Sequence, residues 1–425
     1  MIYYSKGNPE AELTDQDLRE GLFQVFEKLD KRKKVLAIPP DITRYYSKAG
    51  LLTALSYEYY GESLADILPA LGTHAPMSKT EIDHMFPGVP ASLFRVHDWR
   101  NDVVTLGEVP ASYVEQVSEG RVSYALPVQV NRLLKEGGHD LILSLGQVVP
   151  HEVIGMANYN KNIFVGTGGP EGINKSHFLG AAFGMERIMG RTNTPVRAVL
   201  NYASERFARD LPLLYVLTVI GRAPSGALVV RGLFIGDDED CFQAAASLSL
   251  QVNFEMVEIP LDKVVVYLDP HEFKSTWLGN KSIYRTRMAI ADGGELVVLA
   301  PGLKEFGEDR EIDRLIRKYG YRTTEEILKA VEEKAELKAN LGAAAHLIHG
   351  STEGRFTVTY CPGSITREEI ESVNYKYAGL EQMMKKYNPE VLKDGKNIMP
   401  DGEEIFYISN PALGLWSCRD RFNSE

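Results

Sequence analysis

Three side chains that can do chemistry lie in the segment GQVVPHEVIGMANYNKNIFVGTGGPEGINKSHFLGA, residues 146–181. They are His151, Lys161 and His177. An imidazole can transfer protons or bind a metal near neutral pH, and an amine can bond covalently to a cofactor. Taken singly, each of these residues is more often structural or solvated. The question is whether the three serve one site.

The glycines after Lys161 add a weaker signal. Gly166, Gly168 and Gly169 allow a close approach of the backbone to something bulky, such as a phosphate. The run lacks the complete phosphate-loop or dinucleotide-binding pattern, so its specificity is low. Further on, Ser176 reads as a helix N-cap, which puts His177 in the first turn of a helix. The helix dipole there keeps the imidazole neutral, the form that ligates a metal.

Two earlier loops carry groups that fit the same kind of site. In PPDITR, residues 39–44, Asp41 and Thr43 can form a hydrogen-bonded cluster that presents Arg44 to an anion. An ordinary turn with Arg44 in solvent is about equally consistent with this motif. In GTHAPM, residues 72–77, His74 lies in a loop shaped by Gly and Pro.

The elements that must position these groups follow from short apolar runs. Residues 35–38, 141–145 and 214–220 predict strands, and residues 13–29 predict an amphipathic helix. Alternation of strand, loop and helix predicts α/β architecture with a mainly parallel sheet, in which ligands lie at the carboxyl ends of strands.

A second alternating unit follows, so the sequence predicts two α/β domains with the active site in the cleft between them. Strands are expected at 264–268 and 296–300, a helix at 281–291, and mostly amphipathic helix over 317–350. We place the N-terminal catalytic and cofactor-binding domain at residues 1–258 and the C-terminal domain at 259–399. The tail, 400–425, can return to the first domain. These three ranges are expectations.

Composition narrows the class of protein. A net charge of −11 argues against a nucleic-acid or anionic-membrane partner. No stretch approaches the roughly 20 apolar residues of a membrane span. The three cysteines are far apart, which argues against a zinc ribbon or a disulfide framework. We expect a cytoplasmic protein that binds a small molecule, with oligomerisation left open.

Five motifs in order resemble the nickel-pincer lactate racemase family over residues 35–180. They are D-x-T-R at 41–44, G-T-H ending at His74, P-H ending at His151, Lys161 ten residues later, and His177 sixteen residues after that. In that family a pyridinium-3,5-bisthiocarboxylic acid mononucleotide grips one nickel ion as a pincer. The resemblance implies that Lys161 carries this nucleotide covalently and that His177 is the nickel ligand of the protein.

The resemblance also implies roles for the other loops. His74 and His151 are expected to be the acid/base pair on opposite faces of the substrate, and Arg44 to hold its carboxylate. Asp41 and Thr43 are expected to brace the cofactor or Arg44, and we group Gly168 with the cofactor-binding residues.

The expected chemistry suits these residue types. A C2 hydrogen of a 2-hydroxy acid is too weakly acidic for an imidazole to remove at neutral pH. Its transfer as hydride to the cofactor, while a histidine takes the hydroxyl proton, gives a 2-oxo acid. Return of the hydride to the other face inverts the centre, which requires one base for each face.

The second domain departs from the family pattern. Lactate racemases carry a Tyr-Gln pair and a Lys there, and here only Tyr284 matches. Arg285 replaces the Gln, and Met288 stands where the Lys is expected. With Lys281 and Trp277 nearby, these residues favour a larger and more polar substrate than lactate. We expect C2 epimerisation of a sugar acid, an aldonate such as gluconate or mannonate, unless the cations are only ion-paired at a helix end.

Other functions stay open at this point. The chain can be a racemase of lactate or another small 2-hydroxy acid. It can also be a cofactor-free two-base racemase with a carboxylate-bound divalent cation. A non-catalytic module that binds a carbohydrate acid or a metal is the alternative from another class.

Overall fold

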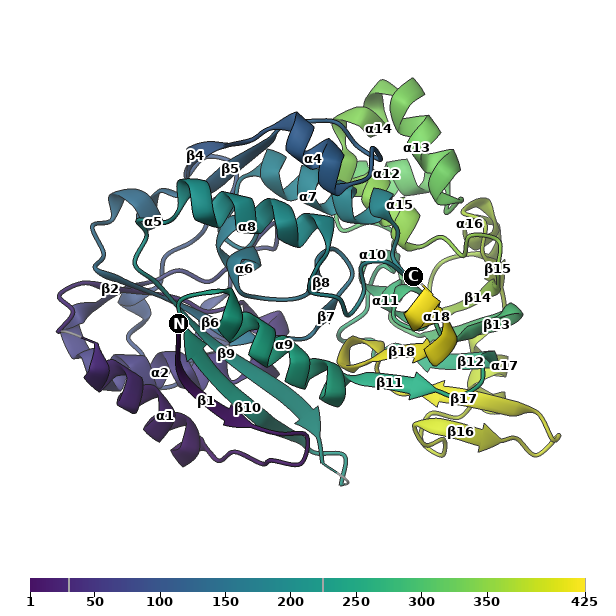
Figure 1. The fold of residues 1–425 in the computed structure, drawn as a ribbon. Coiled ribbons are helices and arrows are strands. Elements are labelled where there is room, and N and C mark those ends of the chain that lie inside the picture. Colours follow the sequence, from purple (N-terminus) through teal and green to yellow (C-terminus); the bar gives the residue numbers. More distant parts are fainter. Residues whose placement is uncertain (30, 224, 425) are drawn as a thin grey trace. The chain divides into compact units, whose positions relative to one another are not determined.

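The computed structural model describes residues 1–29, 31–223 and 225–424, and the contacts within it divide the chain into two compact units. Unit 1 comprises residues 1–176 and 189–253, and unit 2 comprises residues 177–188 and 254–425. Each unit contains one mixed sheet that is mainly parallel, with helices around it (Figure 1). The predicted fold class is therefore confirmed.

The sheet of unit 1 has six strands. In spatial order they are β1 (Ile2–Gly7), β10 (Leu228–Gly236), β9 (Leu213–Arg222), β6 (Leu141–Gln147), β2 (Val35–Ile38) and β3 (Leu64–Ile67). From β9 to β3 all neighbours are parallel, and β10 and β1 add an antiparallel edge. The three strands predicted in this half of the chain are thus confirmed.

Helices cover both faces of this sheet (Figure 1). The predicted helix near residues 13–29 is α1, which begins after Thr14 in a reciprocal capping box with Asp17. The helices of this unit are α1 (Asp15–Lys28), α2 (Ala49–Tyr60), α3 (Lys79–Met85), α4 (Ala111–Val117), α5 (Arg132–Glu136), α6 (Asn160–Phe164), α8 (Pro195–Phe207) and α9 (Glu239–Asn253). A hairpin of β4 (Val103–Val109) and β5 (Leu126–Asn131) and a small one of β7 (Pro150–His151) and β8 (Gly155–Met156) complete it. One helix, α7 (Pro170–Phe183), runs across the change of unit.

The packing of unit 1 follows the alternation of its strands. Leu214 and Val216 of β9 join the core that α1 and α2 cover, with Leu22 and Leu52 among its members. Tyr215, between them in sequence, faces the other way and packs against Tyr159. Both faces are buried, as the continuous apolar run of β9 predicts.

The sheet of unit 2 also has six strands. Their spatial order is β15 (Lys376–Tyr377), β14 (Thr357–Pro362), β13 (Ile290–Ala300), β12 (Leu261–Tyr267), β17 (Glu404–Ile408) and β16 (Gly395–Ile398), with only β16 antiparallel. A separate parallel pair joins β11 (Phe254–Val257) to β18 (Leu415–Cys418). Strand β18 of the tail pairs with β11, which lies inside the range 1–258 expected for the first domain, and the contacts group both strands with unit 2. The expected domain ranges stay predictions.

The helices of unit 2 are shorter than predicted. They are α10 (Thr276–Gly279), α11 (Lys281–Tyr284), α12 (Arg310–Tyr319), α13 (Thr324–Glu333), α14 (Ala335–Ala339), α15 (Leu341–His349), α16 (Arg367–Ser372), α17 (Leu380–Lys386) and α18 (Arg419–Ser424). The helix expected over 281–291 lasts one turn, because Ile290 already pairs with Leu261 as the start of β13. The helical stretch 317–350 is broken at Gly320, where φ is +65°, and restarts at the caps Thr323 and Asn340.

No helix among the described residues combines the length and the apolar character that crossing a membrane requires.

Candidate functional site

Three loops with predicted site residues leave the same edge of the sheet in unit 1. Strands β6, β2 and β3 are adjacent and parallel, so their carboxyl ends lie together. Arg44 and Asp41 follow β2, His74 follows β3, and His151 follows β6. The sequence therefore placed these residues at the correct ends of their strands. The edge is the usual location of ligands in open α/β sheets.

Asp41 holds His74 in a defined tautomer. The carboxylate Oδ2 lies 2.6 Å from His74 Nδ1, and Thr43 donates to Oδ1 from its hydroxyl at 2.5 Å and its backbone nitrogen at 3.1 Å. A carboxylate only accepts, so the pair puts a proton on Nδ1 and leaves Nε2 as the outward atom. Burial alone favours protonated Asp41, but the bonds from His74 and Thr43 hold its pKa below the ordinary value.

Arg44 lies in the first turn of the 3₁₀ helix η1 (Ile42–Ser47), which begins after Asp41. Its backbone departs from helical geometry, with φ −114° and ψ 30°. Among the described residues, no carboxylate lies within ion-pair distance of its half-buried guanidinium. The group is available to a bound anion, which is one of the two interpretations that the sequence left open for this motif.

His151 is the buried last residue of β7 in the small β7–β8 hairpin. Its Nδ1 accepts a hydrogen bond, whereas Nδ1 of His74 donates one. The backbone nitrogen of Val153 donates to His151 Nδ1 at 3.1 Å, whereas Glu152 Oε2 lies 3.6 Å from the same atom. Because the Val153 N–H needs an acceptor, His151 Nδ1 has no proton, and the neutral ring carries its proton on Nε2. His74 and His151 are thus held in opposite tautomers.

Lys161 is the second residue of α6, and its neighbour Asn162 fixes this short helix to the sheet. The Asn162 amide donates to Ile38 O at the end of β2 and to Ser144 Oγ in the middle of β6, each at 3.0 Å. In the described part of the chain, no hydrogen bond or ion pair holds the Lys161 ammonium. Burial, followed by the charge of Arg44, lowers the pKa of Lys161 to about 8. An amine in this state is partly neutral near physiological pH, as nucleophilic attack requires.

The turn before Lys161 has an uncommon backbone. Asn158 and Tyr159 have φ of +65° and +58°, a region that residues other than glycine rarely adopt. Each such residue costs on the order of 1–3 kcal/mol and needs surrounding structure to hold it. Tyr159 is held by its ring, which stacks on Phe242 at 5.2 Å between centroids and packs on Tyr215 at 4.5 Å.

The glycines after Lys161 pack against the protein itself. A Cβ at Gly168 would lie 2.0 Å from Phe164 O, and one at Gly169 would lie 2.2 Å from the Gln129 side chain. The Gly168 carbonyl also lies 3.0 Å from His97 Nε2. Protein packing therefore accounts for the absence of side chains here, and a cofactor contact of Gly168 stays a prediction.

His177 does not lie where the sequence argument put it. Helix α7 begins at Pro170, so Ser176 and His177 are in its interior, and the Ser176 hydroxyl donates to Ile173 O at 2.8 Å. The predicted N-cap at Ser176 is wrong. The helix dipole is therefore no reason to expect a neutral His177 ring. Pro170 signals the true start, because proline is favoured in the first helical turn. His177 is the first residue of the segment that groups with unit 2.

The predicted substrate residues of unit 2 differ in exposure. Arg285 is buried and donates to Gly414 O at 3.1 Å, and Tyr284 is buried with its ring 6.0 Å from that of His349. Lys281 and Trp277 are half-buried. The Lys281 ammonium lies 5.5 Å from the Phe273 ring centroid, within reach of a cation–π contact.

Sequence reasoning missed a buried polar cluster beside these residues. The Trp277 ring stacks on His346 at 4.6 Å, and His346 Nε2 lies 3.0 Å from Tyr321 Oη. Burial, with a smaller effect of His349, lowers the pKa of His346 to about 3, so this ring is neutral. The two histidines are three residues apart on α15, which is the one signal that the sequence offered.

A second missed contact anchors the segment that contains His177. Arg287 is buried, and its Nε donates to Glu186 Oε1 at 2.7 Å, with Arg355 3.8 Å from the same oxygen. Glu186 follows α7 in the chain. The ion pair therefore attaches residues 177–188 to the segment of unit 2 that contains Arg287 and continues into β13.

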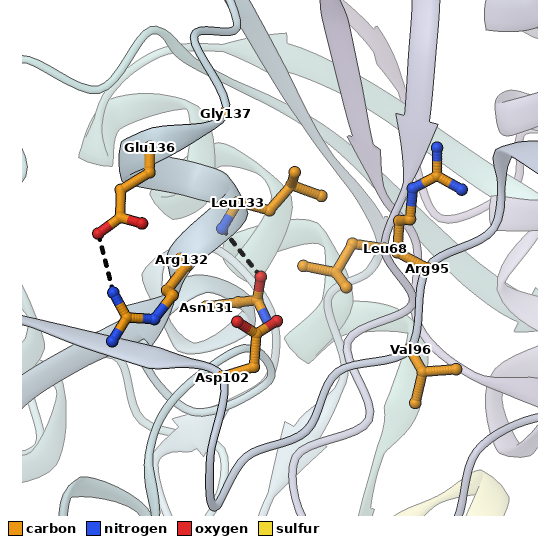
Figure 2. A pocket seen from close by; sticks show the side chains of 9 residues that line it. All are labelled: Leu68, Arg95, Val96, Asp102, Asn131, Arg132, Leu133, Glu136 and Gly137. Atoms are coloured by element: carbon orange, nitrogen blue, oxygen red, sulfur yellow. Dashed lines mark hydrogen bonds and ion pairs between the residues drawn. The ribbon is translucent and has the colours of Figure 1, made fainter.

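A cavity of about 350 Å³ lies elsewhere in unit 1 and includes none of the predicted site residues. Figure 2 shows it between Leu68 and Val96 on one side and Leu133, Asn131 and Asp102 on the other. Its two guanidinium groups, Arg95 and Arg132, are matched by acidic side chains, with Arg132 bound to Glu136 at 3.0 Å. The balanced charge does not select a class of ligand.

Within residues 1–29, 31–223 and 225–424, no group of three or more His, Cys, Asp or Glu side chains is arranged to hold a metal ion. A cofactor that brings its own metal donors needs only one ligand from the protein, and His177 is compatible with that requirement. The Lys161 amine, unpaired and with a lowered pKa, fits the covalent attachment of such a group. The Lys161 amine and the His177 imidazole are therefore groups of the kinds that the expected nickel-pincer nucleotide needs, and its binding stays a prediction.

The comparison with protein-family models matches the part of the chain that contains these residues. Residues 24–187 match the family model described as the lactate racemase N-terminal domain. This range holds every predicted residue of unit 1, together with His177. No curated protein matches the chain significantly in sequence.

Solved structures extend the likeness to the whole chain. A protein from Thermotoga maritima is similar with 25% identity and a TM-score of 0.82, over 98% of this chain and 100% of that one. The lactate racemase apoprotein from Thermoanaerobacterium thermosaccharolyticum is similar with 19% identity and a TM-score of 0.67, over 96% of this chain and 90% of that one. At this identity, the second likeness is one of fold.

Proposed function

We propose that this protein is a racemase or epimerase that inverts C2 of a 2-hydroxy acid and uses a nickel-pincer nucleotide bound covalently at Lys161. The observation that carries the proposal is the Lys161 amine. It has no polar partner among the described residues, its pKa is lowered to about 8, and it lies within the region that matches the lactate racemase N-terminal domain. The histidines at the same sheet edge supply the acid/base groups that the reaction needs.

When bound, the nucleotide supplies an acceptor and donor for the C2 hydrogen as hydride. The chain would hold it through Lys161 and, at nickel, through His177. Arg44 binds the substrate carboxylate in this proposal, because its guanidinium has a free edge for two parallel hydrogen bonds. This contact fixes C2 and its hydroxyl with respect to the loops that contain the histidines.

The proton on the C2 hydroxyl is handled by His74 and His151. His74 Nε2 is the lone-pair atom in the neutral ring and accepts the proton, since Asp41 stabilises the imidazolium that results. His151 Nε2–H is a donor and steadies the oxygen from the other face. For His151 to act as a base, its Nδ1 must be protonated and must exchange Val153 for Glu152. Inversion in either direction therefore includes a change of partner at His151 Nδ1.

A sugar acid is our preferred substrate. Lys281 and Trp277 support it, because both side chains are half-buried and an ammonium group and an indole ring are of the types that bind polyhydroxylated chains. Arg285 supports it less, since its guanidinium already binds Gly414 O. Lactate or another small 2-hydroxy acid is the second candidate, and it is favoured by the match to the lactate racemase N-terminal domain.

Two measurements test the proposal. Protein made together with the cofactor pathway should show a mass adduct on the Lys161 peptide and one nickel per chain. A panel of lactate and aldonates, incubated with this protein, should show inversion at C2, with no change at other stereocentres of the aldonate. Neither adduct nor nickel in such protein would contradict the proposal, and inversion of lactate alone would contradict the sugar-acid assignment.

A further inference from the structure

Arg197 is a buried cation without a carboxylate partner among the described residues. It lies in the first turn of α8, after the N-cap Thr194, and 1% of it is exposed. A buried charge is costly unless hydrogen bonds replace its hydration. The groups that replace it for Arg197 belong mainly to one short segment of the chain.

The guanidinium binds the segment that leads to Lys161. Its Nη2 donates to Met156 O at 2.7 Å, and its Nη1 donates to Asn160 Oδ1. Both nitrogens also lie 3.4 Å from Asn158 O, at the outer limit of a hydrogen bond. Three acceptors on residues 156–160 are therefore fixed by one planar group, a geometry that arginine provides and lysine does not.

Aromatic and amide contacts hold the same turn from its other sides. The guanidinium carbon lies 4.2 Å from the Phe242 ring centroid, and Phe242 stacks on Tyr159. The Asn160 amide nitrogen donates to Asn201 Oδ1 at 2.7 Å, so both ends of that side chain are bound. These contacts enclose the two residues with positive φ, which would relax without them.

We propose that Arg197 is a positioning residue for the Lys161 amine, because it fixes the strained turn of Asn158 and Tyr159 from which α6 begins. The role assigned to the amine rests on the function proposed above. The geometric part of the inference does not, since it concerns the backbone of this chain alone.

The positive charge of Arg197 also affects the Lys161 amine, because it lowers the pKa of that amine. Burial lowers the pKa of Lys161 most, and Arg44 and Arg197 lower it further, whereas Glu152 and Asp41 raise it. Removal of the cation at position 197 should therefore raise the pKa of the amine. A lysine at 197 keeps the charge and loses the planar contacts, so it separates the two effects.

The test uses the full-length protein without cofactor. Lys161 is acylated with acetic anhydride from neutral to alkaline pH, and its labelling is read by mass spectrometry against exposed Lys329. Hydrogen exchange of residues 157–164 is followed in parallel. The variants are Arg197→Met and Arg197→Lys, and Arg206→Met is the control that removes an exposed arginine from the same helix.

In Arg197→Met, we expect exchange in 157–164 to be about tenfold faster and the half-labelling pH of Lys161 to rise above about 8. Arg197→Lys should show the faster exchange with a half-labelling pH close to that of the parent, and Arg206→Met should change neither. Unchanged local exchange in both Arg197 variants would overturn the proposal, even if the half-labelling pH moves. If Arg197→Met does not fold, exchange in Arg197→Lys decides alone. A positive result stands even where no cofactor adduct is found on Lys161, so the two proposals fail separately.

Discussion

His74 Nδ1 and Asp41 Oδ2 lie 2.6 Å apart, so Asp41 decides which nitrogen of His74 carries the proton in the neutral ring. The contrast with His151, whose Nδ1 accepts from Val153 N, gives the two histidines different starting states. A general acid/base pair needs groups that differ in this way, because at any moment one member accepts and the other donates.

Asp41→Asn should lower turnover by about 10²-fold, because an amide no longer fixes the tautomer or stabilises the imidazolium of His74. The variant should also unfold more easily at neutral pH, by about 1–3 kcal/mol, since charge-assisted bonds are lost. The folded pKa of Asp41 is lowered, so its stabilisation is present above the ordinary carboxyl pKa and lost as pH falls through the folded value. Urea unfolding at neutral and acidic pH measures this difference. An equal gap at both would contradict the assignment.

Lys161→Met should stabilise the cofactor-free protein at neutral pH. The amine has a folded pKa of about 8, below that of an unfolded lysine, so its burial opposes folding while it is charged. The Lys161 side chain is half-buried, so solvent screening reduces the expected gain in the free energy of unfolding to about 1–2 kcal/mol. The gain should be complete below pH 8 and should disappear as pH rises towards the unfolded pKa. Thermal unfolding across this range measures it, and a loss of stability at neutral pH would show that the ammonium has a favourable partner.

Asn162→Ala should destabilise unit 1 by about 1–3 kcal/mol, because Ile38 O loses a buried donor and α6 loses its attachment to two strands. Ser144→Ala is the matched control, since it removes one of the two acceptors and leaves the bond to Ile38. Its loss should be smaller. Denaturant unfolding of both variants gives the comparison, and an equal or larger loss in Ser144→Ala would show that Asn162 does not link the strands in this way.

His177→Ala should remove nickel from protein that has been loaded with the cofactor, while the Lys161 adduct remains. Ser176→Ala is the adjacent control. The Ser176 hydroxyl binds Ile173 O inside α7, so this variant should keep both nickel and fold. Metal analysis together with mass spectrometry gives the two readings. Full nickel content in His177→Ala would assign the ligand to another residue.

Local pattern was sufficient to predict the strands of unit 1 and the strand-end positions of Arg44, His74 and His151. These depend on apolar runs and on the rule that parallel strands end together, and both are visible in the sequence. The helix expected at 281–291 failed because Ile290 pairs with Leu261, a tertiary contact that outweighs local helical spacing.

The supporting contacts could not be read from the sequence. Arg197 looks like a solvated charge near a helix start, and its burial depends on Phe242 and on the carbonyl of Met156, both distant in the chain. Asn162 looks like a loop residue, and its partners at Ile38 and Ser144 come from separate strands. In both cases the decisive information is three-dimensional, since a side-chain amide or guanidinium carries no periodic signal.

Helix α6 is five residues long, which has a consequence for the order of events during synthesis. A helix of this length does not form alone in water, and its nucleation depends on contacts made elsewhere. Those contacts come from the Asn162 amide, whose two acceptors exist side by side only after β2 has paired with β6. We therefore expect the Lys161 amine to reach its position late in folding, so that any attachment to it is a maturation step performed on the folded domain.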